Sequence, residues 1–183
     1  MHRLGQMVDG EEVAHSHRPT YRLPSADSRN PRIVVGVPDS DPNVLLRLAR
    51  CLDDPLFLLY ILHTPRGEAE AGRYQSPELM FRDVESFIED FRPFLAGDGR
   101  FDLWVYSPSQ KATLAWDRHN LLHAYGPLDC YEATLRVSGF TPGHPSVPAP
   151  HAHHYRPALD DLAAKVIARF DWQWTPLRPE DEQ

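Results

Sequence analysis

"FDLWVYSPSQKATLAWDRHNLLHAYG", residues 101–126, is the stretch of the chain that most clearly predicts the fold. From Phe101 to Tyr106, apolar residues alternate with other side chains, and this period of two is typical of a strand with one buried face. Two more strand-sized segments, 111–116 and 121–125, follow short stretches that are rich in turn-forming residues. The stretch therefore predicts a three-stranded antiparallel meander between residues 101 and 125.

The rest of the chain predicts one more interior strand and several helices. "LFLLYIL", residues 56–62, is an unbroken apolar run that is too short for a helix, so it predicts a strand with both faces buried. Residues 77–95 carry an apolar stripe at spacings of three and four, with Ser76 as the expected N-cap. Further helices are expected at 42–52, 128–139 and 158–170. We therefore predict a single α+β domain in which three or four helices pack on a mainly antiparallel sheet.

The two ends of the chain are expected to lie outside this domain. Residues 1–31 show no sustained periodicity and are rich in Arg, His, Ser and Pro, so they predict a mobile N-terminal arm. The domain is expected to span 32–177, beginning with an edge strand at 32–37 and closing with another at 171–177. Residues 178–183 are expected to form a solvated acidic tail.

Composition and charge exclude several kinds of partner. A chain of 183 residues with 42% hydrophobic residues is long enough for one domain with a substantial core. Its net charge of -7 argues against a nucleic-acid partner, which would require a basic face. No apolar run approaches the roughly 18 residues of a membrane helix, so no membrane partner is expected. The first residues lack the apolar core of a secretory signal, which predicts a cytoplasmic location.

Cys51 and Cys130 are the only cysteines. Their positions match no metal-binding or redox motif. In a cytoplasmic chain, both thiols are expected to be reduced and mostly buried.

The segment "PHAHHYRP", residues 150–157, is a candidate metal site. In an extended chain, side chains two positions apart share a face, so His151 and His153 can hold one ion while His154 points away. A zinc shell needs three or four ligands, and the residues that can complete it are His123, His144 and Asp160.

The competing interpretation of this segment is structural. Its spacing matches no metal-binding signature, so no cofactor is predicted and zinc is the minority hypothesis. Pro150 and Pro157 restrict the backbone at both ends. This interpretation predicts a loop that packs Tyr155 and at least one histidine against the body of the protein.

Two other groups of residues are candidate binding sites. Asp117, Arg118 and His119 lie at the expected hairpin tip, where a carboxylate beside an imidazole can form a general base. The alternative is an ordinary turn in which Asp and Asn side chains bond nearby backbone. Arg73 and Tyr74, in the long polar segment between the strand 56–62 and the next helix, are the other candidates.

The function expected from the sequence is non-enzymatic binding of another protein. The chain has no phosphate-binding glycine loop and no nucleophile elbow, and its acidic body would complement a basic partner. Its size and composition are also similar to those of small bacterial accessory proteins, including immunity proteins that neutralise secreted toxins. The alternative is a metal-binding protein or metal-dependent hydrolase that uses the histidine-rich segment.

Overall fold

The structure is a computed structural model that describes residues 2–181. Its main feature is a nine-stranded sheet in the order β10-β3-β4-β9-β8-β7-β5-β6-β12, antiparallel except between β10 and β3. Its strands are β3 (Thr20–Arg22), β4 (Ile33–Gly36), β5 (Phe57–Leu62), β6 (Gly72–Gln75), β7 (Phe101–Ser107), β8 (Ala112–Trp116), β9 (Leu121–Tyr125), β10 (Thr141–Pro142) and β12 (Gln173–Thr175). A second sheet, of order β11-β1-β2, contains β1 (Leu4–Val8), β2 (Glu11–Ala14) and β11 (His151–His153).

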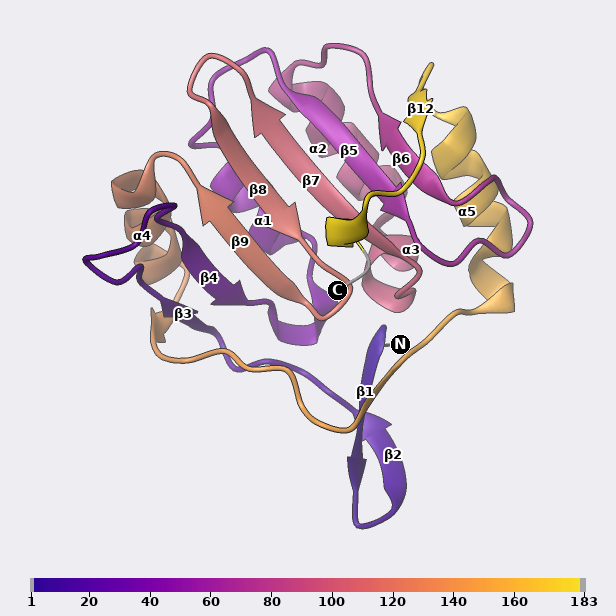
Figure 1. Cartoon of the computed structure of the whole chain (residues 1–183), viewed down its shortest axis with the longest axis horizontal. Coiled ribbons are helices and arrows are strands. Elements are labelled where there is room, and N and C mark those ends of the chain that lie inside the picture. The colour runs from indigo at the N-terminus through magenta and orange to yellow at the C-terminus, as the bar shows by residue number, and fades with distance from the viewer. Residues whose placement is uncertain (1, 182–183) are drawn as a thin grey trace.

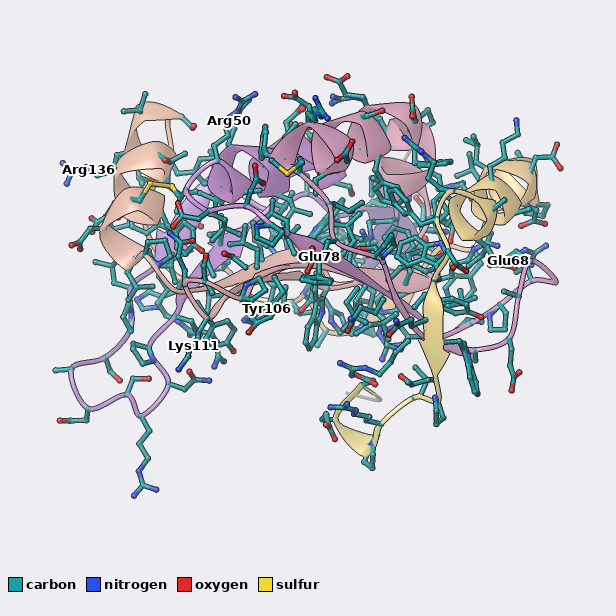
Figure 2. All side chains as sticks on the ribbon, turned by 90° about the horizontal axis from the view of Figure 1, so that it is seen from above. Arg50, Glu68, Glu78, Tyr106, Lys111 and Arg136 are labelled. Atoms are coloured by element: carbon teal, nitrogen blue, oxygen red, sulfur yellow. A yellow bond between two sulfur atoms is a disulfide. The ribbon has the colours of Figure 1, made fainter. Side chains whose placement is uncertain are left out.

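The helices of the described residues cover one face of the large sheet (Figures 1 and 2). They are α1 (Asn43–Ala49), α2 (Phe81–Asp90), α3 (Arg92–Gly97), α4 (Leu128–Val137) and α5 (Asp160–Ala168), with short 3-10 segments η1 (Pro38–Ser40), η2 (Pro157–Leu159) and η3 (Pro179–Asp181). Phe101, Leu103 and Val105 of β7 are fully buried in the core between the sheet and these helices. The predicted single α+β domain with a mainly antiparallel sheet is therefore confirmed.

The strand predictions from the middle of the chain are also confirmed. β7, β8 and β9 form the expected antiparallel meander, and β5 lies inside the sheet between β7 and β6. β12 pairs with β6 alone and forms one edge of the sheet, as expected for the segment 171–177. Strong period-two patterns and unbroken apolar runs are the signals that made these strands predictable.

The N-terminal segment differs from the arm without regular structure that its composition predicts. It forms β1, β2 and β3, and the side chains of Arg3 and Leu4 are fully buried. Because β3 pairs with β4, the segment 32–37 is not an edge strand but an interior one between β3 and β9. Strands of three to five residues are too short to leave a clear periodic pattern in the sequence. The division into arm, domain and tail stays a prediction.

The helix predicted at 77–95 begins later, at Phe81, and is divided into α2 and α3. Ser76 is not its N-cap, because the Ser76 hydroxyl accepts a hydrogen bond from the Leu58 amide at 2.9 Å and so joins the end of β6 to β5. The Asp83 carboxylate instead accepts a hydrogen bond from the backbone amide of Met80, the residue just before the helix, at 2.9 Å. The Asp54 carboxylate accepts a second hydrogen bond, from the amide of Phe81 at 2.8 Å, so the first turn of α2 is capped by one local and one distant carboxylate.

Residues 178–180 of the predicted acidic tail are exposed, but Asp181 is not. Asp181 is buried and forms an ion pair with Arg73 of β6. The backbone amide of Arg178 donates a hydrogen bond to the same carboxylate at 2.8 Å. Residues 182 and 183 of the predicted tail lie outside the described residues.

Cys51 and Cys130 form a disulfide, so the prediction of two reduced thiols is wrong. Cys51 lies shortly after α1 and Cys130 lies in α4, so the bond joins two helices through residues that are 79 positions apart in sequence. No periodic pattern marks this contact, because it depends on how the two helices pack on the sheet. Among residues 2–181, no helix is both long enough and apolar enough to cross a membrane.

We predict that the double substitution Cys51→Ala/Cys130→Ala lowers the free energy of unfolding by about 2–4 kcal/mol, because the bond closes a long loop and restricts the unfolded chain. Urea unfolding of both proteins without reductant measures the difference. Reductant added to the wild-type protein should reproduce the loss. Two reactive thiols in the denatured, unreduced wild-type protein would contradict the assignment.

Candidate functional site

The histidine-rich segment does not form an isolated loop. Residues 151–153 form β11, which pairs with β1 of the N-terminal hairpin. In Figure 1 this hairpin projects from one end of the large sheet, beside the segment that leads to α5. The pairing places Leu4 opposite His153 and Gln6 opposite His151, so the first strand of the chain fixes the position of both histidines.

Arg3 fixes this small sheet to the large one. Its guanidinium is fully buried and donates hydrogen bonds to the carbonyl oxygens of Phe101 at 2.8 Å and Asp117 at 3.3 Å. It also lies over the rings of Phe101 and Trp116, with distances of 4.7 and 4.6 Å to the ring centroids. Burial lowers the pKa of Arg3 to about 10, so the group stays charged at neutral pH. The N-terminal hairpin is therefore anchored beside the turn that carries Asp117.

Arg156 follows β11 and fixes the same end of this strand. Its backbone amide donates to the buried Asp98 carboxylate at 2.8 Å, and its guanidinium donates to the carbonyl oxygens of His2 and Gly97 at 2.8 and 3.0 Å. Asp98 is itself paired with the buried Arg100 at 2.8 Å. This polar network fixes the segment directly after the histidines.

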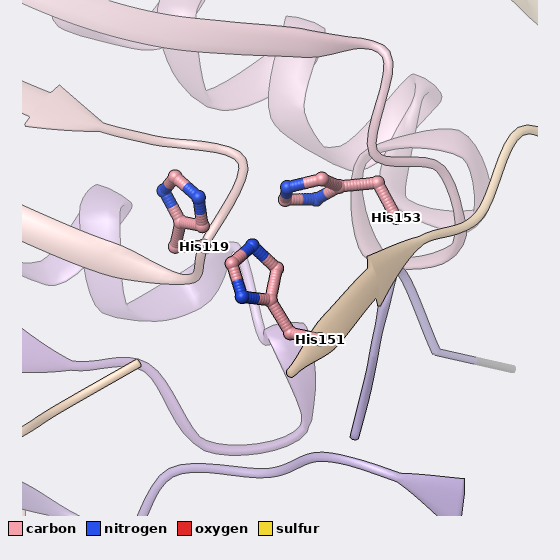
Figure 3. Close-up of side chains that lie close together, drawn as sticks. All are labelled: His119, His151 and His153. Carbon is pink, nitrogen blue, oxygen red and sulfur yellow. The ribbon is translucent and has the colours of Figure 1, made fainter. Parts of the chain in front are cut away.

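Three imidazoles from two distant segments converge at this end of the sheet. His151 and His153 of β11 face His119, which lies in the turn between β8 and β9 (Figure 3). The ring centroids are 4.9–5.2 Å apart, and one nitrogen of each ring lies within 4.8 Å of the others. We call these three residues the histidine triad.

A hydrogen bond prepares one of the three rings, that of His151, to offer Nε2. His151 Nδ1 lies 2.9 Å from the Pro148 carbonyl oxygen, to which it donates its proton. His119 Nδ1 lies 3.8 Å from the Asp117 carboxylate. A ring that donates from one nitrogen presents the lone pair of the other. His151 Nε2 is therefore available as a metal ligand, and the Asp117 carboxylate near His119 Nδ1 is compatible with the same role for His119 Nε2.

His153 is partly buried, whereas His151 is exposed. Burial, together with the neighbouring His119 and Arg118, lowers the pKa of His153 to about 3. Its Nδ1 is buried and has no hydrogen-bond partner among the described residues. The ring is therefore neutral at physiological pH, as a metal ligand must be.

Asp117 organises the turn that carries His119. One carboxylate oxygen accepts hydrogen bonds from the backbone amides of His119 and Leu121, each at 2.9 Å. The other lies 3.4 Å from His123 Nε2. Burial alone would raise the pKa of Asp117, but the hydrogen bonds from His119, His123 and the Leu121 amide lower it below its ordinary value. Asp117 therefore stabilises an ordinary turn and also lies beside the candidate binding residues His119 and His123.

A groove of about 750 Å³ lies beside the triad on the sheet face that the helices leave uncovered. Trp104 and Tyr125 supply aromatic surface to it, and Arg118 and His119 line it close to the turn. Lys111 also lines it, and points away from the helical side in Figure 2. His119 is therefore shared between the groove and the triad.

Other residues predicted for a site lie elsewhere. His123 contacts Asp117 in the groove but is not part of the triad, and His144 borders a separate hollow with His15 and His17. Asp160 is engaged by Arg100 and Arg66 at 2.9 and 3.1 Å. These three residues therefore do not complete a shell with His151 and His153.

Arg73 and Tyr74 belong to β6 and not to a loop, because the segment 63–76 contains this strand. Tyr74 is 7% exposed and donates its hydroxyl proton to the Glu70 carbonyl oxygen at 2.5 Å. Arg73 is buried against Asp181. Tyr155, predicted to be buried, is only partly buried.

Sequence reasoning missed the histidines of the N-terminal segment. His17 is buried, and its Nε2 lies 2.9 Å from the His119 carbonyl oxygen. His15 packs against His17 with ring centroids 4.7 Å apart. The sequence does hold a signal for them, since "HSH" at 15–17 repeats the His-x-His pattern of 151–153.

We predict that Asp117→Asn destabilises the protein by about 1–3 kcal/mol at pH 7, because charge-assisted hydrogen bonds to the carboxylate are weakened. A carboxyl whose pKa is lowered by folding contributes stability above its unfolded pKa of about 3.9, and this contribution is lost as the pH falls toward the folded value. The difference between wild type and variant should therefore shrink below about pH 4.

Urea unfolding between pH 7 and pH 3 measures this difference. Asp27→Asn, at an exposed aspartate, is the matched control and should change stability little. A difference that is independent of pH would show that the Asp117 charge contributes nothing.

No protein-family model, curated protein or solved structure matches this chain. The donor atoms, distances and burial of the described residues are therefore the grounds for assigning it a function.

Proposed function

We propose that this protein binds a divalent transition-metal ion, with zinc as the best match, through His119, His151 and His153. The observation that carries the proposal is the convergence of one nitrogen from each ring to within 4.8 Å of the others. The three residues come from two segments more than 30 positions apart, so proximity in sequence does not explain their meeting.

The distances fit a metal ion after a small movement of the side chains. For three atoms no more than 4.8 Å apart, there is a point within about 2.8 Å of each of them. Zinc–imidazole bonds are about 2.0–2.1 Å long, so each nitrogen would move inward by less than about 1 Å. Imidazole is a ligand that zinc, copper, iron and nickel accept, whereas calcium and magnesium prefer oxygen. The donor set therefore favours a transition metal.

The surroundings of the triad also fit a metal site. The Pro148 carbonyl and the Asp117 carboxylate lie beside the outer nitrogens of His151 and His119, the positions at which metal-bound histidines usually have partners. Three protein ligands leave a fourth position for water or substrate, which is the pattern of catalytic zinc sites. His151 is exposed, so solvent can reach that position. Metal-activated hydrolysis is therefore the reaction class that this donor set suits.

We predict that His119→Ala, His151→Ala or His153→Ala removes one equivalent of bound zinc from the tag-free protein, or weakens its binding at least about tenfold. Loss of a residue that only supports a ligand already costs about 10–100-fold in affinity, and loss of a ligand should cost no less. Elemental analysis after equilibration with zinc, together with calorimetric titration, measures both quantities.

His144→Ala is the matched control for this experiment, because His144 lies outside the triad. It should bind as much zinc as the wild type. If the three triad variants retain the wild-type stoichiometry and affinity, the triad does not hold the ion.

Binding of a protein partner is the second candidate function, and the groove on the uncovered sheet face favours it. Trp104 and Tyr125 offer aromatic surface there, and Arg32 and Arg118 offer planar cationic groups. These residue types are enriched in protein interfaces. The acidic body of the chain would complement a basic partner.

We predict that a stoichiometric protein partner captured from the native host is lost with Trp104→Ala and kept with Tyr106→Ala. Tyr106 is an exposed aromatic residue of the same strand that does not line the groove. Affinity capture followed by quantitative mass spectrometry is the measurement. Equal capture by both variants would place any partner elsewhere on the protein.

The cytoplasmic location expected from the first residues stays a prediction. The Cys51–Cys130 disulfide argues against it, because disulfides persist mainly in oxidising compartments.

A further inference from the structure

We propose a second metal site, formed by His2, Glu12 and His154 on the opposite side of the histidine-rich segment from the triad. Successive side chains of an extended segment point to opposite sides, so His153 faces the triad while His154 faces the N-terminal hairpin. The donors of this site are separate from those of the triad. The inference therefore goes beyond the proposed function and does not depend on it.

The three donor atoms of the second site are already close together. His154 Nε2 lies 2.6 Å from Glu12 Oε1 and 3.1 Å from His2 Nε2, and all three donor atoms lie within 4.8 Å of one another. Ligand atoms of a tetrahedral zinc ion with bonds of 2.0–2.1 Å are about 3.4 Å apart. The 3.1 Å separation is close to this value, and the 2.6 Å separation would widen by about 0.8 Å to admit the ion. Two imidazoles with one carboxylate are an ordinary donor set for such an ion.

The His154–Glu12 contact by itself is that of an ordinary ion pair, so the contact that needs a further explanation is the one between His2 Nε2 and His154 Nε2 at 3.1 Å. An imidazole nitrogen offers either one proton or one lone pair, in a single direction. If His154 Nε2 donates its proton to Glu12, it has no lone pair to accept a proton from His2. If instead it accepts from His2, its lone pair faces the carboxylate oxygen at 2.6 Å. A cation between the three atoms satisfies every lone pair at once.

The backbone leaves room for these donors at Gly5. A Cβ atom on Gly5 would lie 2.5 Å from Glu12 Oε1 and 3.1 Å from His154 Nε2. Because Gly5 has no side chain, the Glu12 carboxylate and the His154 ring can approach each other across β1. The His2 carbonyl oxygen is held by Arg156, and the His154 amide donates to the Arg3 carbonyl oxygen at 3.0 Å. The same contacts that fix the hairpin therefore also set the positions of two donors.

An ion at this site would join three chain segments. Glu12 belongs to β2, His2 precedes β1 and His154 follows β11, so the ion would close the three-stranded sheet. This small sheet has few buried side chains of its own, since all four residues of β2 are exposed. We infer a structural role for the second ion, in contrast to the open position expected at the triad.

The test measures zinc bound per chain in the tag-free, full-length protein, by elemental analysis and native mass spectrometry, with Zn²⁺ alone as the probe. Wild type should bind two equivalents. Glu12→Gln and His2→Ala should each bind one, and Glu11→Gln, at the neighbouring exposed position of β2, should bind two. Gly5→Ala keeps every donor and should also lose one equivalent. Circular dichroism of each variant checks that the fold is intact.

A double variant, His119→Ala/His153→Ala, separates the two sites and should retain one equivalent. Two equivalents in Glu12→Gln and His2→Ala would overturn the second site. The second site would also be overturned if the wild type bound a single equivalent of zinc and the double triad variant bound none. That result would leave the proposed function intact. If the wild type bound a single equivalent of zinc, Glu12→Gln bound none and the double triad variant still bound one, the second site would be supported and the triad overturned.

Discussion

Arg3 carries a positive charge into the interior at the end of the large sheet. Its guanidinium reaches the carbonyl oxygens of Phe101 and Asp117 and lies between the rings of Phe101 and Trp116. A buried guanidinium is costly unless its protons are bonded, so this geometry allows little displacement of the N-terminal strand. Because β1 begins one residue later, the position of Arg3 determines where β1 lies, and β1 determines where β11 lies.

The meeting of the three triad histidines follows from this chain of contacts. Arg3 bonds the backbone of the turn that carries His119, and β1 pairs with the strand that carries His151 and His153. The triad therefore joins the large sheet, the N-terminal hairpin and the segment before α5. An ion at the triad would stabilise the docked hairpin, since its ligands come from both sides of that contact.

The sequence predicted the parts of the fold whose patterns are long and regular. The meander and the strand at 56–62 were visible because each repeats a strand pattern over several residues. The N-terminal strands were not, because strands of three to five residues are too short to show a period. For the candidate site, the sequence identified His151, His153 and His119 separately. It did not predict that these three side chains meet, because their contact depends on Arg3 and on strand pairing across some 150 positions.

Anomalous diffraction at the zinc absorption edge, from crystals of the full chain grown with zinc, shows directly whether the histidine triad holds the ion. We expect an anomalous peak about 2.0–2.2 Å from one nitrogen each of His119, His151 and His153, with a water or other small ligand in the fourth position. Zinc bound elsewhere on the protein, with no anomalous density between these three rings, would contradict this expectation.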